Sequence, residues 1–249
     1  MDSQSKRGRR RRFSKELWEL LANGQMDDCR LTPQGSNYTF YANLSNGTHQ
    51  QCRVVYKPRR GEAPLWDFPD GTLYRREYAA YLLSEALGWG FVPPTVIRDG
   101  VYGIGSVQLY VETDPMSNYF TLQESNPEEL LRVCTYDVIA NNADRKASHC
   151  LLGTDGRIWA IDHGITFHTE PKLRTVIWDF AGDPLPQKII KDLERFLRRL
   201  DESEWFGKQF ALLLRREELA ALRYRVKDLI EYPVFPLPGL RRAVPWPWI

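Results

Sequence analysis

The sequence of 249 residues lacks any long apolar run, and neither sign of charge is in large excess. Because no stretch of about 18 apolar residues occurs, we expect no membrane span and no signal peptide, and the sequence predicts a cytoplasmic protein. The formal net charge of +2 gives no broad attraction for nucleic acid, so no nucleic-acid partner is expected. The one obvious basic run, KRGRRRR at 6–12, predicts a disordered basic tail over residues 1–13.

Motifs of common metal sites are absent as well. The four cysteines have no CxxC spacing, which argues against a zinc knuckle, and the HExxH pair of a metalloprotease does not occur. Each cysteine lies in an apolar or strand-like context, so buried free thiols are predicted. They are Cys29, Cys52, Cys134 and Cys150.

The sequence does contain enough apolar residues for a full core. Of its residues, 43% are apolar and 12% aromatic, which predicts one large domain or two small lobes. In the first half, Ser14 can cap a short helix, three strands follow as a meander, and a longer helix precedes two more strands. The predicted helices are 15–22 and 73–88, and the predicted strands are 29–33, 38–44, 51–57, 94–100 and 107–112.

The second half of the chain is mainly helical. A helix over 127–142 begins with Pro and two acidic residues, as helix N-termini often do. Two short strands at 149–153 and 157–162 flank a TDG turn. Two amphipathic helices are predicted over 187–200 and 205–230, and the segment after them is too rich in proline for regular structure.

The order of these elements predicts an α+β fold with two lobes. Residues 14–112 would form a small, antiparallel, β-rich N-lobe with one main helix, and residues 113–249 a mainly helical C-lobe. This order is typical of the protein-kinase-like fold. Phosphoryl transfer requires a cation for the phosphates, a carboxylate at the acceptor, ligands for metal ions and a cover over the nucleotide. The sequence offers a candidate for each.

The candidate cation is Lys57, at the end of the third strand in VVYKP. Glu77 follows twenty positions later (77 minus 57), in the middle of the main N-lobe helix. A lysine and a glutamate in these places are typical of the pair that holds the α and β phosphates in kinases. A second interpretation stays open, because Arg75 and Arg76 lie next to Glu77 and can hold it in a surface pair.

The candidate carboxylates are Asp144 and Asp162. Asp144 lies in a loop after a helix, and Asp162 follows eighteen positions later (162 minus 144), at the end of a strand and directly before His163 and Gly164. An Asp in a loop, a β-hairpin and then Asp-x-Gly is the order that places both carboxylates at one edge of a cleft. One carboxylate would face the acceptor and the other a metal ion.

The candidate nucleotide cover is a hairpin with a single glycine, because no GxGxxG motif occurs. In QGSNYTF, the residues Gly35, Ser36 and Asn37 offer a hydroxyl and backbone N–H groups to a phosphate. The same stretch can also be a plain turn. Adenine is expected against the strand VQLYVE, where the backbone of Tyr110 and Val111 would supply hydrogen bonds.

These residues carry a resemblance to a known family. The motifs ADRKASH and IDHG stand where the phosphatidylinositol 3- and 4-kinases carry GDRHxxN and an IDFG-type motif. The chain is more closely similar to a family of small bacterial proteins that look like these kinases, over roughly residues 28–185. Its spacing of Asp and Asn also resembles that of the HipA-type kinases.

The resemblance implies that the chain binds ATP with Mg or Mn, and it implies a role for each motif residue. Asp144 would be the catalytic carboxylate, Arg145 the arginine of the DRH element, Lys146 the replacement of the usual histidine, Asp162 a metal ligand, Lys57 the phosphate lysine and Glu77 its partner. The implied fold is the protein-kinase-like fold.

The chain departs from the family pattern at His149, which stands where these kinases have a metal-binding Asn. Magnesium prefers oxygen ligands, whereas imidazole suits softer ions such as manganese. His149 is therefore predicted to bind a metal ion together with Asp162. Three alternatives stay open: a contact to phosphate, a structural role, or a weak or lost activity. His163 replaces the Phe of the metal motif.

The sequence thus predicts an ATP-dependent phosphotransferase whose acceptor is a protein, a small molecule or a lipid. Two other function classes stay open. A pseudokinase would bind nucleotide without transferring phosphate and would act as a scaffold or regulator. A metal-dependent hydrolase would use the histidines that cluster near the second carboxylate. Its candidate residues are His149, Asp162, His163 and His168.

Overall fold

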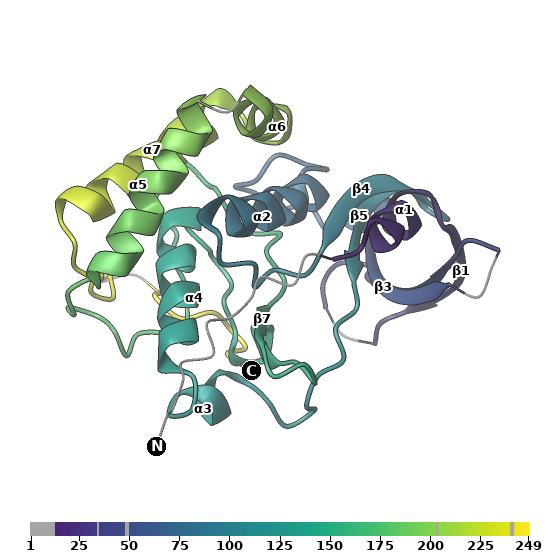
Figure 1. Cartoon of the computed structure of the whole chain (residues 1–249), viewed down its shortest axis with the longest axis horizontal. Coiled ribbons are helices and arrows are strands. Elements are labelled where there is room, and N and C mark those ends of the chain that lie inside the picture. The colour runs from purple at the N-terminus through teal and green to yellow at the C-terminus, as the bar shows by residue number, and fades with distance from the viewer. Residues whose placement is uncertain (1–12, 34, 48–49, 203, 240–241) are drawn as a thin grey trace, which may run out of the picture.

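An antiparallel sheet forms one side of the molecule and a group of helices the other (Figure 1). The computed structural model describes residues 13–33, 35–47, 50–202, 204–239 and 242–249. The basic run at 6–12, predicted as part of a disordered tail, lies outside the described residues. The predicted α+β class, with an antiparallel β-rich N-terminal part and a mainly helical remainder, is confirmed.

Five strands form the main sheet in the order β1-β2-β3-β5-β4, and all neighbouring strands are antiparallel. They are β1 (Gln25–Leu31), β2 (Phe40–Ser45), β3 (Gln51–Pro58), β4 (Thr95–Gly100) and β5 (Gly103–Leu109). The predicted meander of the first three strands is confirmed. The strand predicted at 107–112 is wrong at both ends. It begins at Gly103, because Gly100 pairs with Gly103 across a tight turn, and it ends at Leu109.

Helix α1 (Lys15–Asn23) packs against the sheet and begins where the sequence predicts. The N–H of Leu17 donates to the Ser14 hydroxyl at 3.2 Å, which satisfies one of the amides left unpaired at a helix start. Alternation along β3 turns Val54 and Tyr56 to the same face. Both are buried in one apolar cluster with Leu21 of α1.

Helix α2 (Leu73–Leu87) lies between the sheet and the other helices and is buried on almost every side (Figure 1). Gly88 ends it in a left-handed conformation with φ of 85°, as its position in the sequence predicts. Its charged residues Arg76 and Glu77 are only 2% and 3% exposed. Because buried charges require partners, this helix must be joined by ion pairs to the segments on both sides of it.

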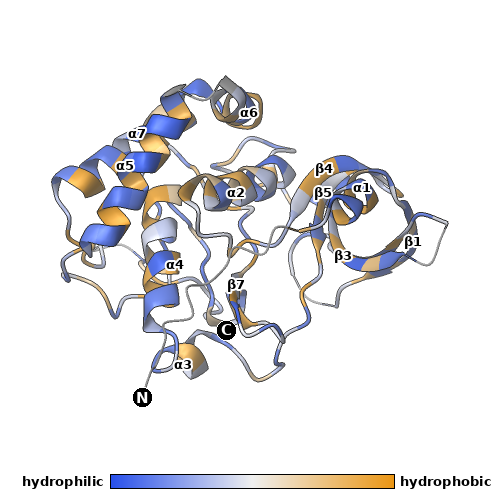
Figure 2. Ribbon diagram, viewed as in Figure 1, coloured by the Kyte–Doolittle hydropathy of each residue, from blue (hydrophilic) through white to orange (hydrophobic). Residues whose placement is uncertain are grey.

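The remaining part of the chain contains mostly helices, several of which enclose one large apolar core. Its helices and strands are α3 (Tyr119–Leu122), α4 (Pro127–Ala140), β6 (Cys150–Leu152), β7 (Ile158–Ala160), α5 (Gln187–Glu202), α6 (Glu204–Leu213) and α7 (Arg216–Glu231). Two short 3-10 turns are also present: η1 (Arg59–Gly61) directly after β3 and η2 (Ala147–His149) directly before β6. Figure 2 shows apolar and polar residues alternating along α5, as expected for a helix with one face on the core. No helix in the described ranges is long and apolar enough to cross a membrane.

The single helix predicted at 205–230 is wrong, because the chain forms α6 and α7 with a break between them. Glu218, in the first turn of α7, accepts a hydrogen bond from the N–H of Arg215 at 2.8 Å. The same carboxylate pairs with Arg76 of α2 at 2.5 Å. Glu218 therefore caps the start of α7 through a local contact, and the distant Arg76 binds the same carboxylate.

Burial of the cysteines differs in part from the prediction. All four are free thiols, as expected. Cys134 and Cys150 are buried, whereas Cys29 and Cys52 are only half-buried. The two half-buried residues lie on β1 and β3, at the side of the small cluster under α1, where the sheet covers them incompletely.

We expect the buried ion pair between Arg76 and Glu218 to be needed for stability, since both side chains are 2% exposed. Glu218→Ala should lower the free energy of unfolding by about 3–5 kcal/mol, because it leaves the Arg76 guanidinium buried without its carboxylate. The double variant Arg76→Met with Glu218→Leu should recover most of this loss. Urea denaturation measures both changes.

The matched control is Glu128→Ala, which breaks an ion pair between Glu128 and Arg132 on the surface of α4. Glu128 is 78% exposed, so its loss should change the free energy of unfolding by less than about 1 kcal/mol. Equal losses for Glu218→Ala and Glu128→Ala would contradict the assignment of a structural role to the buried pair.

Candidate active site

Lys57, Glu77 and Asp162 meet at one point, although they come from β3, from α2 and from the loop after β7. Lys57 Nζ forms an ion pair with Glu77 Oε1 and lies 2.9 Å from Asp162 Oδ1. The alternative of a neighbouring arginine as the partner of Glu77 is wrong, because Arg76 pairs with Glu218 instead. The structure therefore brings together the lysine, the glutamate and one of the two carboxylates that the sequence indicates.

The charges of this cluster stabilise one another. The ammonium of Lys57 holds the pKa of Asp162 well below its usual range, although burial acts in the opposite direction. Burial opposes the charged form of Lys57, but Asp162 and Glu77 outweigh it and raise the pKa of this lysine above its usual value. Burial raises the pKa of Glu77, and Lys57 counters part of that rise. At neutral pH the site thus presents a fixed cation next to an ionised Asp162.

The loop that carries Asp162 is held by Glu77. Glu77 Oε2 accepts a hydrogen bond from the N–H of His163 at 3.1 Å, while Oε1 binds Lys57. Asp162 itself has a positive φ of 60°, a conformation that residues other than Gly, Asn and Asp seldom adopt. One carboxylate on α2 therefore positions both the lysine and the backbone that aims Asp162.

Arg145 lies underneath the site and does not face it. Its side chain has no exposed surface and pairs with Asp137 of α4 at 2.9 Å. The guanidinium also donates to the carbonyl of Ile161 at 2.8 Å and lies 2.7 Å from His163 Nε2. Arg145 is thus a positioning residue that joins the loop 141–146 to the loop after β7.

Asp137 was not identified from the sequence, yet it anchors the loop that carries Asp144. Besides Arg145, it accepts a hydrogen bond from Asn142 Nδ2 at 2.8 Å. Asn142 Oδ1 in turn accepts the N–H of Asp144 at 3.0 Å. The signal was present in the sequence, because Asp137 interrupts the apolar face of a helix, and a charge buried there requires a partner.

Asp144 is 28% exposed, and its carboxylate lies 3.5 Å from Lys146 Nζ. Burial raises the pKa of Asp144 to about 6, with Lys146 opposing the rise and Asp162 adding to it. A carboxylate with a pKa near neutrality can both accept and release a proton, which suits a general base. The structure thus places Lys146 beside the candidate base, where its charge can stabilise the ionised form.

His149 lies beside Asp162, so the two residues expected at a metal ion are close together. His149 Nε2 is 3.5 Å from Asp162 Oδ2, and Nδ1 accepts the N–H of Lys146 at 3.3 Å. Burial lowers the pKa of His149 to about 4, and the attraction of Asp162 counters only part of this effect. The imidazole is therefore neutral at physiological pH.

A divalent cation fits the open side of Asp162. This side chain is 50% exposed, and Mg²⁺ in proteins typically binds one or two carboxylates while phosphates and water complete its shell. Within the described part of the chain, no three His, Cys, Asp or Glu side chains form a metal-binding group. The described side chains thus form no closed metal cage, and an ion at Asp162 would need further ligand atoms from outside the chain.

The histidines expected for a hydrolase do not converge. His168 Nε2 is hydrogen-bonded to the carbonyl of Asp67 at 2.9 Å, and its Nδ1 accepts the N–H of Glu170 at 3.0 Å. His163 is fully buried against Arg145. Because both nitrogens of His168 serve backbone contacts, the hydrolase interpretation has no histidine cluster on which to rest.

The hairpin predicted to cover the phosphates is tied to its own part of the structure. Asn37 Oδ1 accepts the N–H of Ala63 at 2.7 Å, so this side chain already serves a structural contact. Gly35 and Ser36 are both exposed. Gly35 has a positive φ of 112°, which explains the glycine at this turn.

Tyr110 and Val111 follow the end of β5. The N–H of Tyr110 donates to the carbonyl of Arg53 at 2.9 Å, and the Arg53 guanidinium lies 4.3 Å from the centre of the Tyr110 ring. The backbone of Val111 makes no hydrogen bond to any other described residue. The N–H of Tyr110 is thus engaged within the protein, whereas the backbone of Val111 is open to a base.

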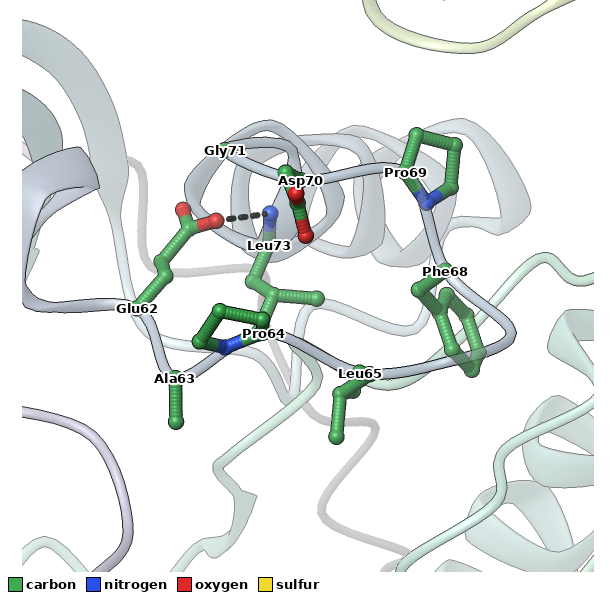
Figure 3. A pocket seen from close by; sticks show the side chains of 9 residues that line it. All are labelled: Glu62, Ala63, Pro64, Leu65, Phe68, Pro69, Asp70, Gly71 and Leu73. Atoms are coloured by element: carbon green, nitrogen blue, oxygen red, sulfur yellow. Dashed lines mark hydrogen bonds between the residues drawn. The ribbon is translucent and has the colours of Figure 1, made fainter.

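A small cavity of about 40 Å³ lies at the start of α2 (Figure 3). Its lining runs from Glu62 to Leu73, in the segment that connects β3 to α2. The Glu62 carboxylate accepts the N–H groups of Leu73 and Tyr74 at 3.0 and 2.8 Å. The carboxylate therefore caps the first turn of α2. The cavity belongs to the segment between β3 and α2, and none of Lys57, Glu77 and Asp162 lines it.

A long sequence match links the chain to a bacterial protein. The chain is 36% identical over 263 aligned positions to Protein Rv2133c of Mycobacterium tuberculosis strain ATCC 25618 / H37Rv, and the match covers 92% of the chain and 94% of that protein. The chain belongs to the Rv2133c family. No profile of an established protein family matches the sequence.

Solved kinase structures share the fold of this Rv2133c-family chain. The Golgi casein kinase superimposes with a TM-score of 0.55 at 14% identity, over 92% of the chain and 76% of the kinase. The proinflammatory kinase CtkA of Helicobacter pylori gives a TM-score of 0.53 at 11% identity, over 86% and 94%. Hydra Fam20 gives 0.51 at 15% identity, over 86% and 87%. The predicted kinase-like fold is confirmed, and at these identities the likeness concerns the fold alone.

The raised pKa of Asp144 predicts a stabilising substitution. An unfolded Asp loses its proton near pH 4, whereas the folded protein keeps that proton up to about pH 6, so stability falls as the pH rises between these values. Asp144→Asn removes the cost of ionisation. We expect it to raise the free energy of unfolding at neutral pH by on the order of 1–3 kcal/mol, and to lose this advantage near pH 4.

Thermal denaturation of both proteins across this pH range tests the expectation. Glu124→Gln, which neutralises an exposed carboxylate in the loop before α4, is the matched control and should show no such pH-dependent difference. An advantage of Asp144→Asn that is absent at neutral pH, or equally large near pH 4, would show that Asp144 is not held in a desolvated position.

Proposed function

We propose that this chain is an ATP-dependent phosphotransferase. The observation that carries the proposal is Lys57 held between Glu77 of α2 and Asp162 of the loop after β7. Kinases require the strand lysine, its helix glutamate and the metal-binding aspartate in place together. A structure of the Golgi casein kinase, which shares the fold, has Mn and ADP bound, which supports a nucleotide and a divalent ion as ligands of this site.

In this proposal Lys57 binds oxygens of the nucleotide phosphates, and Glu77 keeps its ammonium in position. Asp162 would hold a divalent ion, which would supply charge neutralisation for the transferring phosphoryl group. The positive φ of Asp162 and the bond from the His163 N–H to Glu77 fix the direction in which that carboxylate points. Positioning and charge compensation are the main contributions that phosphoryl transfer asks of a protein.

Asp144 is the proposed general base. As the acceptor hydroxyl attacks, its proton passes to Asp144, a bond forms between the acceptor oxygen and the γ-phosphorus, and the bond to the leaving ADP oxygen breaks. Lys146, 3.5 Å away, favours the ionised carboxylate before the transfer. Arg145 acts from below through its contacts to Asp137 and Ile161, which hold the two loops in register.

The nucleotide base is proposed to lie near Val111, whose backbone groups make no hydrogen bond to other described residues. Gly35 and Ser36 would cover the phosphates. We propose an N-lobe of residues 14–112 and a C-lobe of residues 113–249, with the base between them.

The resemblance to phosphatidylinositol 3- and 4-kinases supports an alcohol as the accepting group. That resemblance rests on the motifs around Asp144 and Asp162. It does not select among a protein, a small molecule and a lipid, because fold and phosphate chemistry are shared by kinases with all three acceptor types. The accepting molecule is therefore defined only by its hydroxyl group.

A nucleotide-binding pseudokinase with a scaffolding or regulatory role is the second candidate. The observation in its favour is His149, an imidazole at the position where related kinases place an oxygen ligand for the metal. Both candidates require nucleotide binding. Only the first requires the γ-phosphate to be transferred, so labelled ATP with a mixture of candidate acceptors separates them after binding is established.

We expect ATP with Mg²⁺ or Mn²⁺ to raise the melting temperature of the wild-type protein. At about 100 times the dissociation constant, binding to the native state adds roughly 2.7 kcal/mol to the free energy of unfolding. Asp162→Asn and Lys57→Met should each lose most of this ligand-induced shift, because they remove the metal ligand and the phosphate cation. Differential scanning fluorimetry, with each variant compared with itself without ligand, measures the shift.

Lys227→Ala is the control, since Lys227 is an exposed lysine on α7. It should keep the full ligand-induced shift. A wild-type protein that shows no shift with either metal would contradict the proposed nucleotide site, and a shift that survives in Asp162→Asn and Lys57→Met would place the nucleotide elsewhere.

A further inference from the structure

The two ring nitrogens of His149 have different surroundings. Nδ1 accepts a hydrogen bond from the backbone N–H of Lys146 at 3.3 Å, across the 3-10 turn that ends at His149. Nε2 points the other way and lies 3.5 Å from Asp162 Oδ2. Only a nitrogen without a proton can accept from an N–H group, so Nδ1 is the unprotonated nitrogen and the neutral ring carries its hydrogen on Nε2.

The other tautomer is disfavoured by the same contact. A hydrogen on Nδ1 would face the N–H of Lys146, and two donors would then point at each other. The side chain of His149 is 10% exposed, so water has little access to relieve that conflict. A ring with a proton on both nitrogens would also have no free electron pair on Nε2. In the favoured tautomer, the nitrogen that faces the site is therefore a donor and not a metal ligand.

The nearest charged group to Nε2 is the Asp162 carboxylate, and two lysines that can bind an anion lie beside this carboxylate and beside that of Asp144. Lys57 Nζ lies 2.9 Å from Asp162 Oδ1, and Lys146 Nζ lies 3.5 Å from the carboxylate of Asp144. An N–H donor at Nε2 adds a third group that can bind an oxygen of a phosphate. Mg²⁺ needs only one or two carboxylates when phosphates and water supply the rest of its shell.

We infer that His149 donates the Nε2 hydrogen to a phosphate oxygen of the nucleotide, and that Asp162 is the single side chain of the site that binds a divalent ion. The site would then work with one metal ion per nucleotide. This inference rests on the proposed function. It selects one of the roles open to His149, because the contact to Lys146 leaves the metal-binding role without an electron pair at Nε2.

The first test is direct and needs no substitution. In the nucleotide-free protein, the nitrogen chemical shifts of the His149 ring, assigned with a His149→Gln spectrum, identify which nitrogen carries the hydrogen. We expect Nε2 to be the protonated nitrogen at neutral pH. A protonated Nδ1 with an unprotonated Nε2 would overturn the inference and leave the proposed function standing.

The second test counts metal ions. Mn²⁺ binding to the full chain is titrated by electron paramagnetic resonance at saturating concentrations of a non-hydrolysable ATP analogue. We expect one tightly bound Mn²⁺ per nucleotide in the wild type and a second one in His149→Asn, which supplies an oxygen ligand. His149→Ala should keep one ion and bind the analogue roughly 10- to 100-fold more weakly, because it loses a hydrogen bond to a charged group.

The outcomes separate the two claims. Two ions in the wild type, of which His149→Ala loses one, would show that His149 is a ligand and would overturn this inference alone. A wild-type protein that binds no analogue at any metal concentration would overturn the proposed function as well.

Discussion

The buried ion pair between Arg145 and Asp137 is the contact on which the geometry of the site depends. Neither side chain has any exposed surface, so each charge persists only because the other, together with nearby polar groups, satisfies it. The same guanidinium reaches the carbonyls of His149 and Ile161 at 3.4 and 2.8 Å. Those carbonyls belong to the two segments that carry the site residues, and α4 thus supplies the common frame in which Asp144 can lie near the loop after β7.

Charged contacts also join the sheet side of the molecule to the helical side. Lys57 of β3 meets Asp162, and Arg76 of α2 meets Glu218 of α7. A third pair joins the segment after β3 to the segment after the second carboxylate, where Asp67 and Lys172 lie 2.8 Å apart with little exposure. Apolar contacts are non-directional, whereas ion pairs with short distances favour one arrangement of the partners. These pairs therefore favour one orientation of the sheet side relative to the helical side. They also couple the stability of the fold to the positions of the groups proposed to bind phosphate.

Most elements of the fold followed from the sequence, because their signals are local. The helix predicted at 73–88 and the turn that ends it at Gly88 are found as expected, since apolar spacing and a glycine stop describe a helix without reference to its neighbours. The division of 205–230 into two helices did not follow, because apolar spacing alone does not show that Glu218 caps a new helix there. The start of β5 was misplaced for a related reason, since pairing across the tight turn to Gly100, and not β-propensity, sets where the strand begins.

The sequence by itself determined the kinds of residue at the candidate site and their order: a strand lysine, a helix glutamate, and two aspartates separated by a hairpin. Spacing along a chain can do this because each residue's local element is set by short-range periodicity and turn chemistry. Only the tertiary structure decided which cation Glu77 takes as its partner, that Arg145 is buried, and that Asp137 anchors the loop. It also decided which nitrogen of His149 faces the site. Those facts depend on burial and on hydrogen bonds between segments far apart in sequence, and neither quantity exists until the chain is folded.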